Sequence, residues 1–97
     1  MTVDQKIVGN QATLCVQGRL DTTTAPQLEK AIAALTGIDE LVLDLADMQY
    51  ISSAGLRVLL AAQKTMKKQG EMSICHVNET IMEVFEITGF SDILTIR

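Results

Sequence analysis

Aromatic residues are scarce in this sequence: they make up 3% of its 97 residues, and tryptophan is absent. The core must therefore consist mainly of Leu, Ile, Val, Met and Ala. Proteins that bind single-stranded nucleic acids stack bases on aromatic side chains, so this shortage argues against that class. An excess of positive charge is also missing, because the formal net charge is −4. Phosphate backbones select basic surfaces, and we therefore expect no nucleic-acid partner.

Long apolar runs are missing as well. No stretch approaches the roughly twenty apolar residues that span a lipid bilayer, and the first residues lack the charged and apolar regions of a signal peptide. We therefore expect no membrane insertion and a cytoplasmic location. Hydrophobic residues make up 47% of the chain and charged residues 21%, which is typical of a packed domain. The length predicts one domain over residues 1–97.

The groups that form most enzyme and metal sites are few. The chain has one histidine, His76, and two cysteines, Cys15 and Cys75. Both cysteines lie in apolar, strand-like runs and are expected to be buried free thiols, and no ligand spacing typical of a metal site is present. Nucleotide-binding glycine patterns and the GxSxG motif of hydrolases are absent. We therefore expect no catalytic site, no cofactor and no metal site.

Three carboxylates lie at or just after strand-like runs: Asp21, Asp44 and Asp47. If they cluster at one end of a sheet, they could bind a cation weakly. Carboxylates at strand ends are more often solvated loop groups, because charged side chains are rarely buried without a partner. We therefore interpret these three as solvated.

Strand and helix patterns alternate along the chain. The expected order is strand 3–8, strand 12–17 ending at Gly18, helix 25–35, strand 41–45, helix 53–69, strand 72–77, a short helix capped by Asn78, and an extended segment 93–96. Gly9-Asn10 predicts an antiparallel hairpin between the first two strands. The later alternation favours parallel pairing. The expected fold class is α/β, with a mixed, mostly parallel sheet of four to five strands and three or four helices.

The segment 41–60 changes character in its middle. An apolar strand-like run is followed by a polar passage, then by Ser52-Ser53-Ala54-Gly55, and then by a run of good helix formers. This order places a hydroxyl at the start of a helix, where free backbone amides and the helix dipole favour a negative group such as phosphate. On local sequence alone, either serine can be read simply as a helix N-cap.

Residues 47–60, centred on Ser53-Ala54-Gly55-Leu56, resemble the phosphorylation motif of bacterial anti-sigma factor antagonists, which are STAS-domain proteins. The expected order of elements resembles that family too. The resemblance implies that Ser53 is phosphorylated by a cognate anti-sigma factor with serine-kinase activity and that a PP2C-type phosphatase reverses this. It also implies that the unphosphorylated form binds the anti-sigma factor and so frees a sigma factor.

The residue-by-residue match supports this resemblance with two departures. Ser53 stands two places before Gly55, as the acceptor does in the family, but Ser52 replaces a frequent aspartate and is a rival acceptor. Ala54 stands where relatives often have serine or threonine. Asp47 matches an acidic loop residue, and Asp21 matches the last position of a Gly-x-Leu-Asp segment near the acceptor. The expected partner-binding residues are Asp21, Thr22, Thr23, Asp47, Met48, Ser52, Ala54, Gly55 and Leu56.

A phosphate at Ser53 is expected to weaken partner binding without unfolding the domain, with repulsion from Asp21 and Asp47 adding to the effect. Two other roles are open for a short STAS chain. One is an accessory subunit of a lipid-transport ABC complex, and the other is a structural subunit of a stress-sensing assembly.

Overall fold

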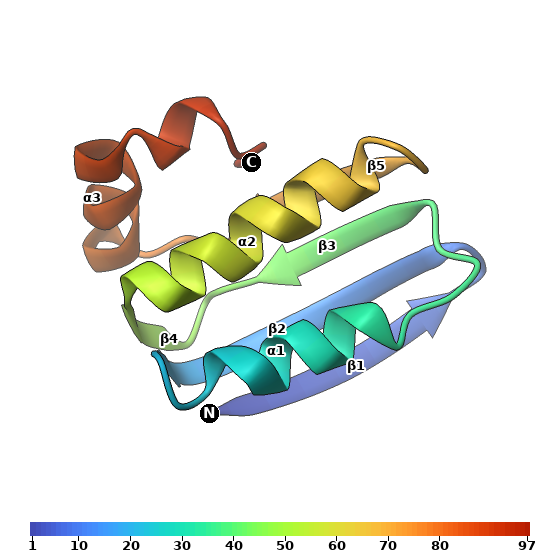
Figure 1. The fold of residues 1–97 in the computed structure, drawn as a ribbon, viewed down its shortest axis with the longest axis horizontal. Coiled ribbons are helices and arrows are strands. Elements are labelled where there is room, and N and C mark those ends of the chain that lie inside the picture. Colours follow the sequence, from blue (N-terminus) through green and yellow to red (C-terminus); the bar gives the residue numbers. More distant parts are fainter.

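A computed structural model describes residues 1–97 and is shown as a ribbon in Figure 1. The elements are β1 (Thr2–Val8), β2 (Gln11–Leu20), α1 (Ala25–Ala33), β3 (Glu40–Asp44), β4 (Met48–Ile51), α2 (Ser53–Met66), β5 (Glu71–Cys75), α3 (Glu79–Thr88) and a 3₁₀ turn at Phe90–Asp92. None of the helices combines the length and the apolar character needed to cross a membrane.

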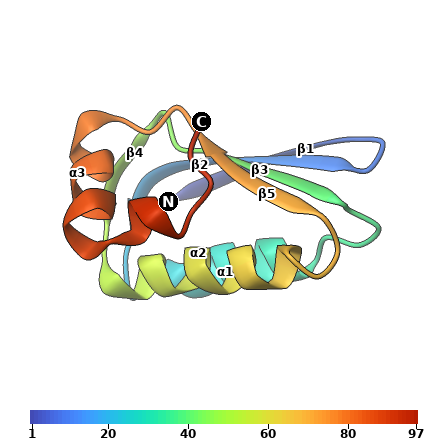
Figure 2. The same ribbon diagram turned by 90° about the horizontal axis from the view of Figure 1, so that it is seen from above.

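The sheet is mixed and mostly parallel, as predicted. Its main strands lie in the order β1-β2-β3-β5, with β1 antiparallel to β2 and the other pairs parallel. The fifth strand, β4, pairs in parallel with the end of β2. Figure 2 shows α1 and α2 on one face of the sheet and α3 at one end, so the opposite face carries no helix. We call this opposite face the open face.

Alternation along β2 separates the core from the open face. Ala12, Leu14 and Val16 are buried toward the helices, while the residues between them are half-buried. Cys15 belongs to this second set, and Cys75 is half-buried as well. Both thiols are free, but the expectation that they are buried is wrong, because strand alternation turns them away from the helices.

Strand β2 is longer than predicted. Instead of ending at Gly18, it continues to Leu20, with an irregular register between Gly18 and Arg19. Gly18 has a φ of +95°, a left-handed conformation that glycine adopts without strain. A bulge bends and twists its strand, so the first part of β2 pairs with β3 and its last residues pair with β4. The polar passage before Ser52, expected to be a loop, therefore contains a strand.

The helices end earlier than predicted, α1 at Ala33 and α2 at Met66. The segment 93–96 makes only one isolated bridge, between Ile74 and Ile96. The predicted cap of α3 is confirmed: the Asn78 side-chain oxygen accepts a hydrogen bond from the Ile81 amide at 2.9 Å. Its side-chain nitrogen also donates to the Met48 carbonyl at 2.7 Å, which fixes the start of α3 against β4.

Candidate functional site at the start of helix α2

Ser52 caps helix α2. Its backbone is extended, with φ −98° and ψ 175°, and its Oγ accepts a hydrogen bond from the Gly55 amide at 3.5 Å. Its own amide donates to the Leu20 carbonyl at 2.9 Å, so the start of α2 is tied to the end of β2. The side chain of Ser52 is half-buried. Of the two serines, Ser52 is therefore the structural cap.

Ser53 is the first residue of α2, and its side chain is exposed. No protein group hydrogen-bonds to its hydroxyl, and the amides of this first turn have no acceptor within the helix. Arg57 lies four residues further along the same helix and is exposed, a spacing that places two side chains on one helix face. Arg57 was not predicted from the sequence, although this spacing was visible there.

Gly55 and Leu56 lie beneath the two serines. A Cβ atom at Gly55 would stand 2.7 Å from the Leu20 Cγ and 2.9 Å from the Ile51 Cγ1. The missing side chain is what lets α2 begin so close to the ends of β2 and β4. Leu56 is 7% exposed. Both residues therefore position the site, and neither offers a side chain to a partner.

The loop after β2 reaches the same place, because Asp21 follows the residue that is bonded to Ser52. The Asp21 Oδ1 accepts hydrogen bonds from the Thr23 amide at 2.9 Å, the Thr23 hydroxyl at 2.7 Å and the Thr24 amide at 3.2 Å. Thr22 lines a groove of about 380 Å³ together with Ala54 and Arg57. The predicted residues Asp21, Thr22, Thr23 and Ala54 therefore do lie near Ser53, and Asp21 holds the loop in shape.

These hydrogen bonds, chiefly that from the Thr23 hydroxyl, lower the pKa of Asp21 below its ordinary value of 3.8. The Asp21 carboxylate therefore stabilises the fold above the ordinary pKa, and this contribution is lost as the pH falls through the lower pKa of the folded state. We expect Thr23→Val to raise the pKa of Asp21 toward 3.8, as measured by NMR titration. Thr22→Val, which removes a hydroxyl that does not bond Asp21, should leave this pKa unchanged.

Asp47 and Met48 lie at the other end of β4 from the serines. The four residues of β4 separate Asp47 from Ser52, so their Cα atoms are five residue steps apart, roughly 16 Å at about 3.3 Å per residue. Met48 is 1% exposed and belongs to the core. The expectation that Met48 lies in a loop beside Ser53 is therefore wrong, because Met48 begins a strand and belongs to the core. Contact between Asp47 and a partner stays a prediction. Asp47 is also too distant to repel a phosphate on Ser53 strongly, since salt screens charges beyond about 8–10 Å.

Arg19 and Tyr50 form an exposed pair near the site, and the contact between their side chains was not predicted. The Arg19 guanidinium lies 4.2 Å from the centre of the Tyr50 ring, and the two residues pair across β2 and β4. The Arg19 Nε is also 4.0 Å from the Asp21 Oδ2. Arginine and tyrosine are enriched among residues that dominate protein–protein interfaces. Their contact depends on the bulge after Gly18, which the sequence pattern does not reveal.

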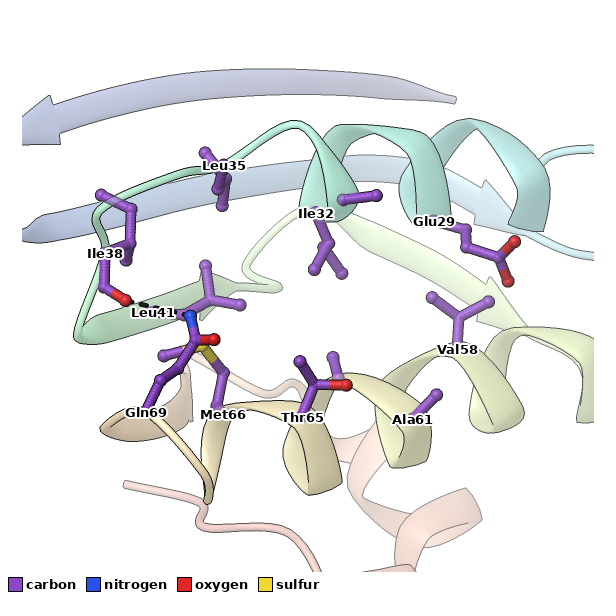
Figure 3. A pocket seen from close by; sticks show the side chains of 12 residues that line it. Glu29, Ile32, Leu35, Ile38, Leu41, Val58, Ala61, Thr65, Met66 and Gln69 are labelled. Atoms are coloured by element: carbon purple, nitrogen blue, oxygen red, sulfur yellow. Dashed lines mark hydrogen bonds between the residues drawn. The ribbon is translucent and has the colours of Figure 1, made fainter.

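An apolar groove of about 350 Å³ runs between α1 and α2 (Figure 3). At one end, the Gln69 side chain donates a hydrogen bond to the Ile38 carbonyl at 3.1 Å. The groove shares Glu29, Val58 and Ala61 with the one beside Thr22. The two grooves therefore follow one seam between the helices, and this seam ends at Ala54, the residue next to Ser53.

Comparison with known proteins places the chain among characterised relatives. The sequence profile of the family described as STAS domain matches residues 2–97. BtrV of Bordetella bronchiseptica, a candidate anti-sigma factor antagonist, is 44% identical over 85 residues, which cover 84% of this chain and 73% of that protein. The anti-sigma-B factor antagonist of Bacillus subtilis is 33% identical over 99 residues, which cover 99% of this chain and 90% of that protein.

Solved structures of anti-sigma factor antagonists have the same fold as this chain. An anti-sigma factor antagonist from Mycobacterium paratuberculosis superposes with a TM-score of 0.88 at 25% identity, over 98% of this chain and 83% of that one. The anti-sigma factor antagonist SpoIIAA matches in its unphosphorylated form with a TM-score of 0.80 at 14% identity, over 99% of this chain and 88% of that one. Its phosphorylated form matches with a TM-score of 0.77 at 13% identity, over 99% and 91%. At these lower identities the likeness concerns the fold alone.

The sequence comparisons show the family. The STAS domain profile spans residues 2–97, and two named relatives are more than 30% identical to this chain. The chain therefore belongs to the STAS domain family and, within it, to the anti-sigma factor antagonists, which are regulatory binding proteins.

Proposed function

We propose that the unphosphorylated chain binds a cognate anti-sigma factor that is also a serine kinase, and that this partner phosphorylates Ser53. The modified chain then dissociates, and a PP2C-type phosphatase resets it. One observation carries the proposal: the Ser53 hydroxyl is exposed and unbonded at the start of α2, beside a serine that is already used as the cap. The phosphorylated structure of SpoIIAA, which has the same fold, is consistent with this cycle.

The geometry favours Ser53 over Ser52 as the acceptor. Phosphorylation of Ser52 would turn the oxygen that caps the Gly55 amide into an ester oxygen, a poorer acceptor, and would place a dianion on a half-buried side chain. Losing an N-cap costs about 1 kcal/mol, and burying a charge costs more unless it is paired. Phosphorylation of Ser53 breaks no hydrogen bond of the folded chain.

The phosphate itself is well accommodated within the chain. It would lie at the positive end of the α2 dipole, near amides that lack an acceptor. Arg57 can reach it from the next helical turn, and Arg57 makes no ion pair within the folded chain. We therefore expect the modified chain to keep its fold, so the change in function arises at the partner interface.

The surface around Ser53 has the composition of an interface. On one side the exposed Thr22 and Thr23 and the half-buried Ala54 offer small side chains. On the other side Arg19 and Tyr50 offer a stacked, exposed pair. A partner that covers this surface would exclude water from Ser53. A phosphate there loses its hydration and faces whatever acidic groups the partner brings, in addition to Asp21.

The decisive experiment is phosphorylation by the partner. The chain is incubated with ATP and each candidate anti-sigma factor of its source that carries a histidine-kinase-like ATP-binding domain, and the increment of one phosphoryl group is followed by mass spectrometry. We expect Ser53→Ala to abolish the increment and Ser52→Ala to retain it, since Ser52→Ala removes only the cap. Loss of the increment in Ser52→Ala alone would overturn the assignment. No increment in the wild type, together with stable association with an ABC-transporter ATPase, would favour the accessory-subunit role.

A further inference from the structure

The open face of the sheet carries a row of reactive side chains. Strand register places Asp4, Cys15, Asp44 and Cys75 side by side across β1, β2, β3 and β5. Residues paired in this way project from the same face of a sheet. This face carries no helix, as Figure 2 shows, so solutes can reach the row from solvent. None of these four residues takes part in the site at Ser53.

His76 turns back onto this row. It follows the last residue of β5 and has a φ of +57°, a left-handed conformation that is uncommon outside glycine but is accessible to histidine and asparagine. In this position its Nδ1 lies 3.1 Å from the Asp44 Oδ2 and 3.5 Å from the Cys75 Sγ. The three potential ligand atoms all lie within 4.8 Å of one another.

These three groups match the ligand types of a zinc site, and the two distances from His76 are close to its dimensions. Zn²⁺ binds thiolate, imidazole and carboxylate at about 2.0–2.3 Å, in tetrahedral geometry, so neighbouring ligand atoms stand roughly 3.3–3.7 Å apart. The distances from the His76 Nδ1, 3.1 Å and 3.5 Å, are close to that range. We propose that Asp44, Cys75 and His76 bind Zn²⁺ on the open face, with water completing the fourth position.

The carboxylate is already oriented for this role. The Asp44 Oδ1 accepts a hydrogen bond from the Ala46 amide at 3.0 Å, which leaves Oδ2 directed at His76. Hydrogen bonds that fix a metal-binding carboxylate in this way are typical of the surroundings of metal sites. The side chains of His76 and Asp44 are 68% and 23% exposed, so an ion can enter without unfolding. Binding releases the thiol proton of Cys75 to solvent.

Cys15 does not belong to the ligand set, although it lies in the same row. It is on β2, and Cys75 is on β5, with β3 between them. Two strand spacings of about 4.8 Å place their backbones roughly 10 Å apart. Two cysteines more than about 7 Å apart between Cα atoms cannot form a disulfide without backbone movement. Cys15 is therefore a matched thiol control on the same face, half-buried like Cys75.

The proposal is tested by titrating the reduced, tag-free, metal-stripped chain with Co²⁺ under anaerobic conditions and then with Zn²⁺. We expect one Co²⁺ per chain, a thiolate-to-cobalt charge-transfer band in the near ultraviolet, and loss of this band when Zn²⁺ displaces Co²⁺. Cys75→Ser should abolish the band. Asp44→Asn and His76→Asn should weaken Zn²⁺ binding by at least about tenfold, because even the outer partners of metal ligands contribute 10- to 100-fold.

Two variants distinguish this zinc site from metal binding elsewhere on the chain. Cys15→Ser and Ser53→Ala should both keep the band and the affinity of the wild type, so the result does not depend on the function proposed for Ser53. Zn²⁺ should also raise the Tm of the wild type and of Cys15→Ser, but not that of Cys75→Ser, because a ligand stabilises the state that binds it. The site is disproved if the wild type shows no one-to-one binding, or if the band survives in Cys75→Ser or is lost in Cys15→Ser. His76 and Asp44 would then form only a hydrogen-bonded pair.

Discussion

The variant Ser53→Asp is expected to bind the anti-sigma factor at least about a hundredfold more weakly than the wild type while keeping its fold. A charge buried at an interface without a partner costs about 3–5 kcal/mol, and each 1.4 kcal/mol is about tenfold in affinity. Aspartate is also favourable in the first turn of a helix, so the free variant should be as stable as the wild type. The loss should therefore lie in the complex.

Isothermal titration calorimetry with the anti-sigma factor measures this loss. Ser53→Asn is the matched control, because asparagine has the shape of aspartate without its charge. It should lose much less affinity. Thr36→Asp adds the same charge at an exposed position outside the site and should bind like the wild type. If the partner binds Ser53→Asp and the wild type equally well, charge at this hydroxyl does not control docking.

The parts of the fold that were predicted are those determined by residues close together in the sequence. The hairpin follows from Gly9-Asn10, and the cap of α3 follows from Asn78, whose side-chain oxygen bonds an amide three residues away. Strand β4 was missed because its two middle residues are both exposed while Met48 and Ile51 are buried, which is not the alternation of a strand. It becomes a strand only through pairing with the end of β2, beyond the bulge at Gly18.

In the candidate site, too, the residues that are adjacent in the sequence were predicted, and those brought together by strand pairing were not. Ser53 and its neighbours were found because strand, serine and helix follow one another directly. Met48 was misplaced together with β4. The cluster of Asp44 and His76 joins residues 32 positions apart, through the pairing of β3 with β5 and the left-handed backbone of His76. No spacing in the sequence expresses these two facts, so the predicted absence of a metal site followed from local patterns alone.

Gly55→Val is expected to have the largest effect on stability near the site. Its Cβ would stand 2.7 Å from the Leu20 Cγ and 2.9 Å from the Ile51 Cγ1, and both contacts are with buried residues of the core. Overpacking of this kind costs up to about 3 kcal/mol. The better helix propensity of valine returns only about 0.4 kcal/mol. We therefore expect a net loss of up to about 2.5 kcal/mol, or a fall in Tm of roughly 10–20 °C for a domain of this size.

Thermal and urea unfolding measure this change, with Ala61→Val as the control at an exposed position of the same helix, on the groove between α1 and α2. That variant adds a branched side chain to an open groove that has room for it, and it should lose no more than about 0.7 kcal/mol. The difference in stability between the two variants tests whether packing in the core positions the site. At Gly55, α2 lies against β2 and β4 because it carries no side chain there, and this contact sets the position of Ser53. If Gly55→Val is as stable as Ala61→Val, the start of α2 is free to shift, and Ser53 is not held in place by the packing described above.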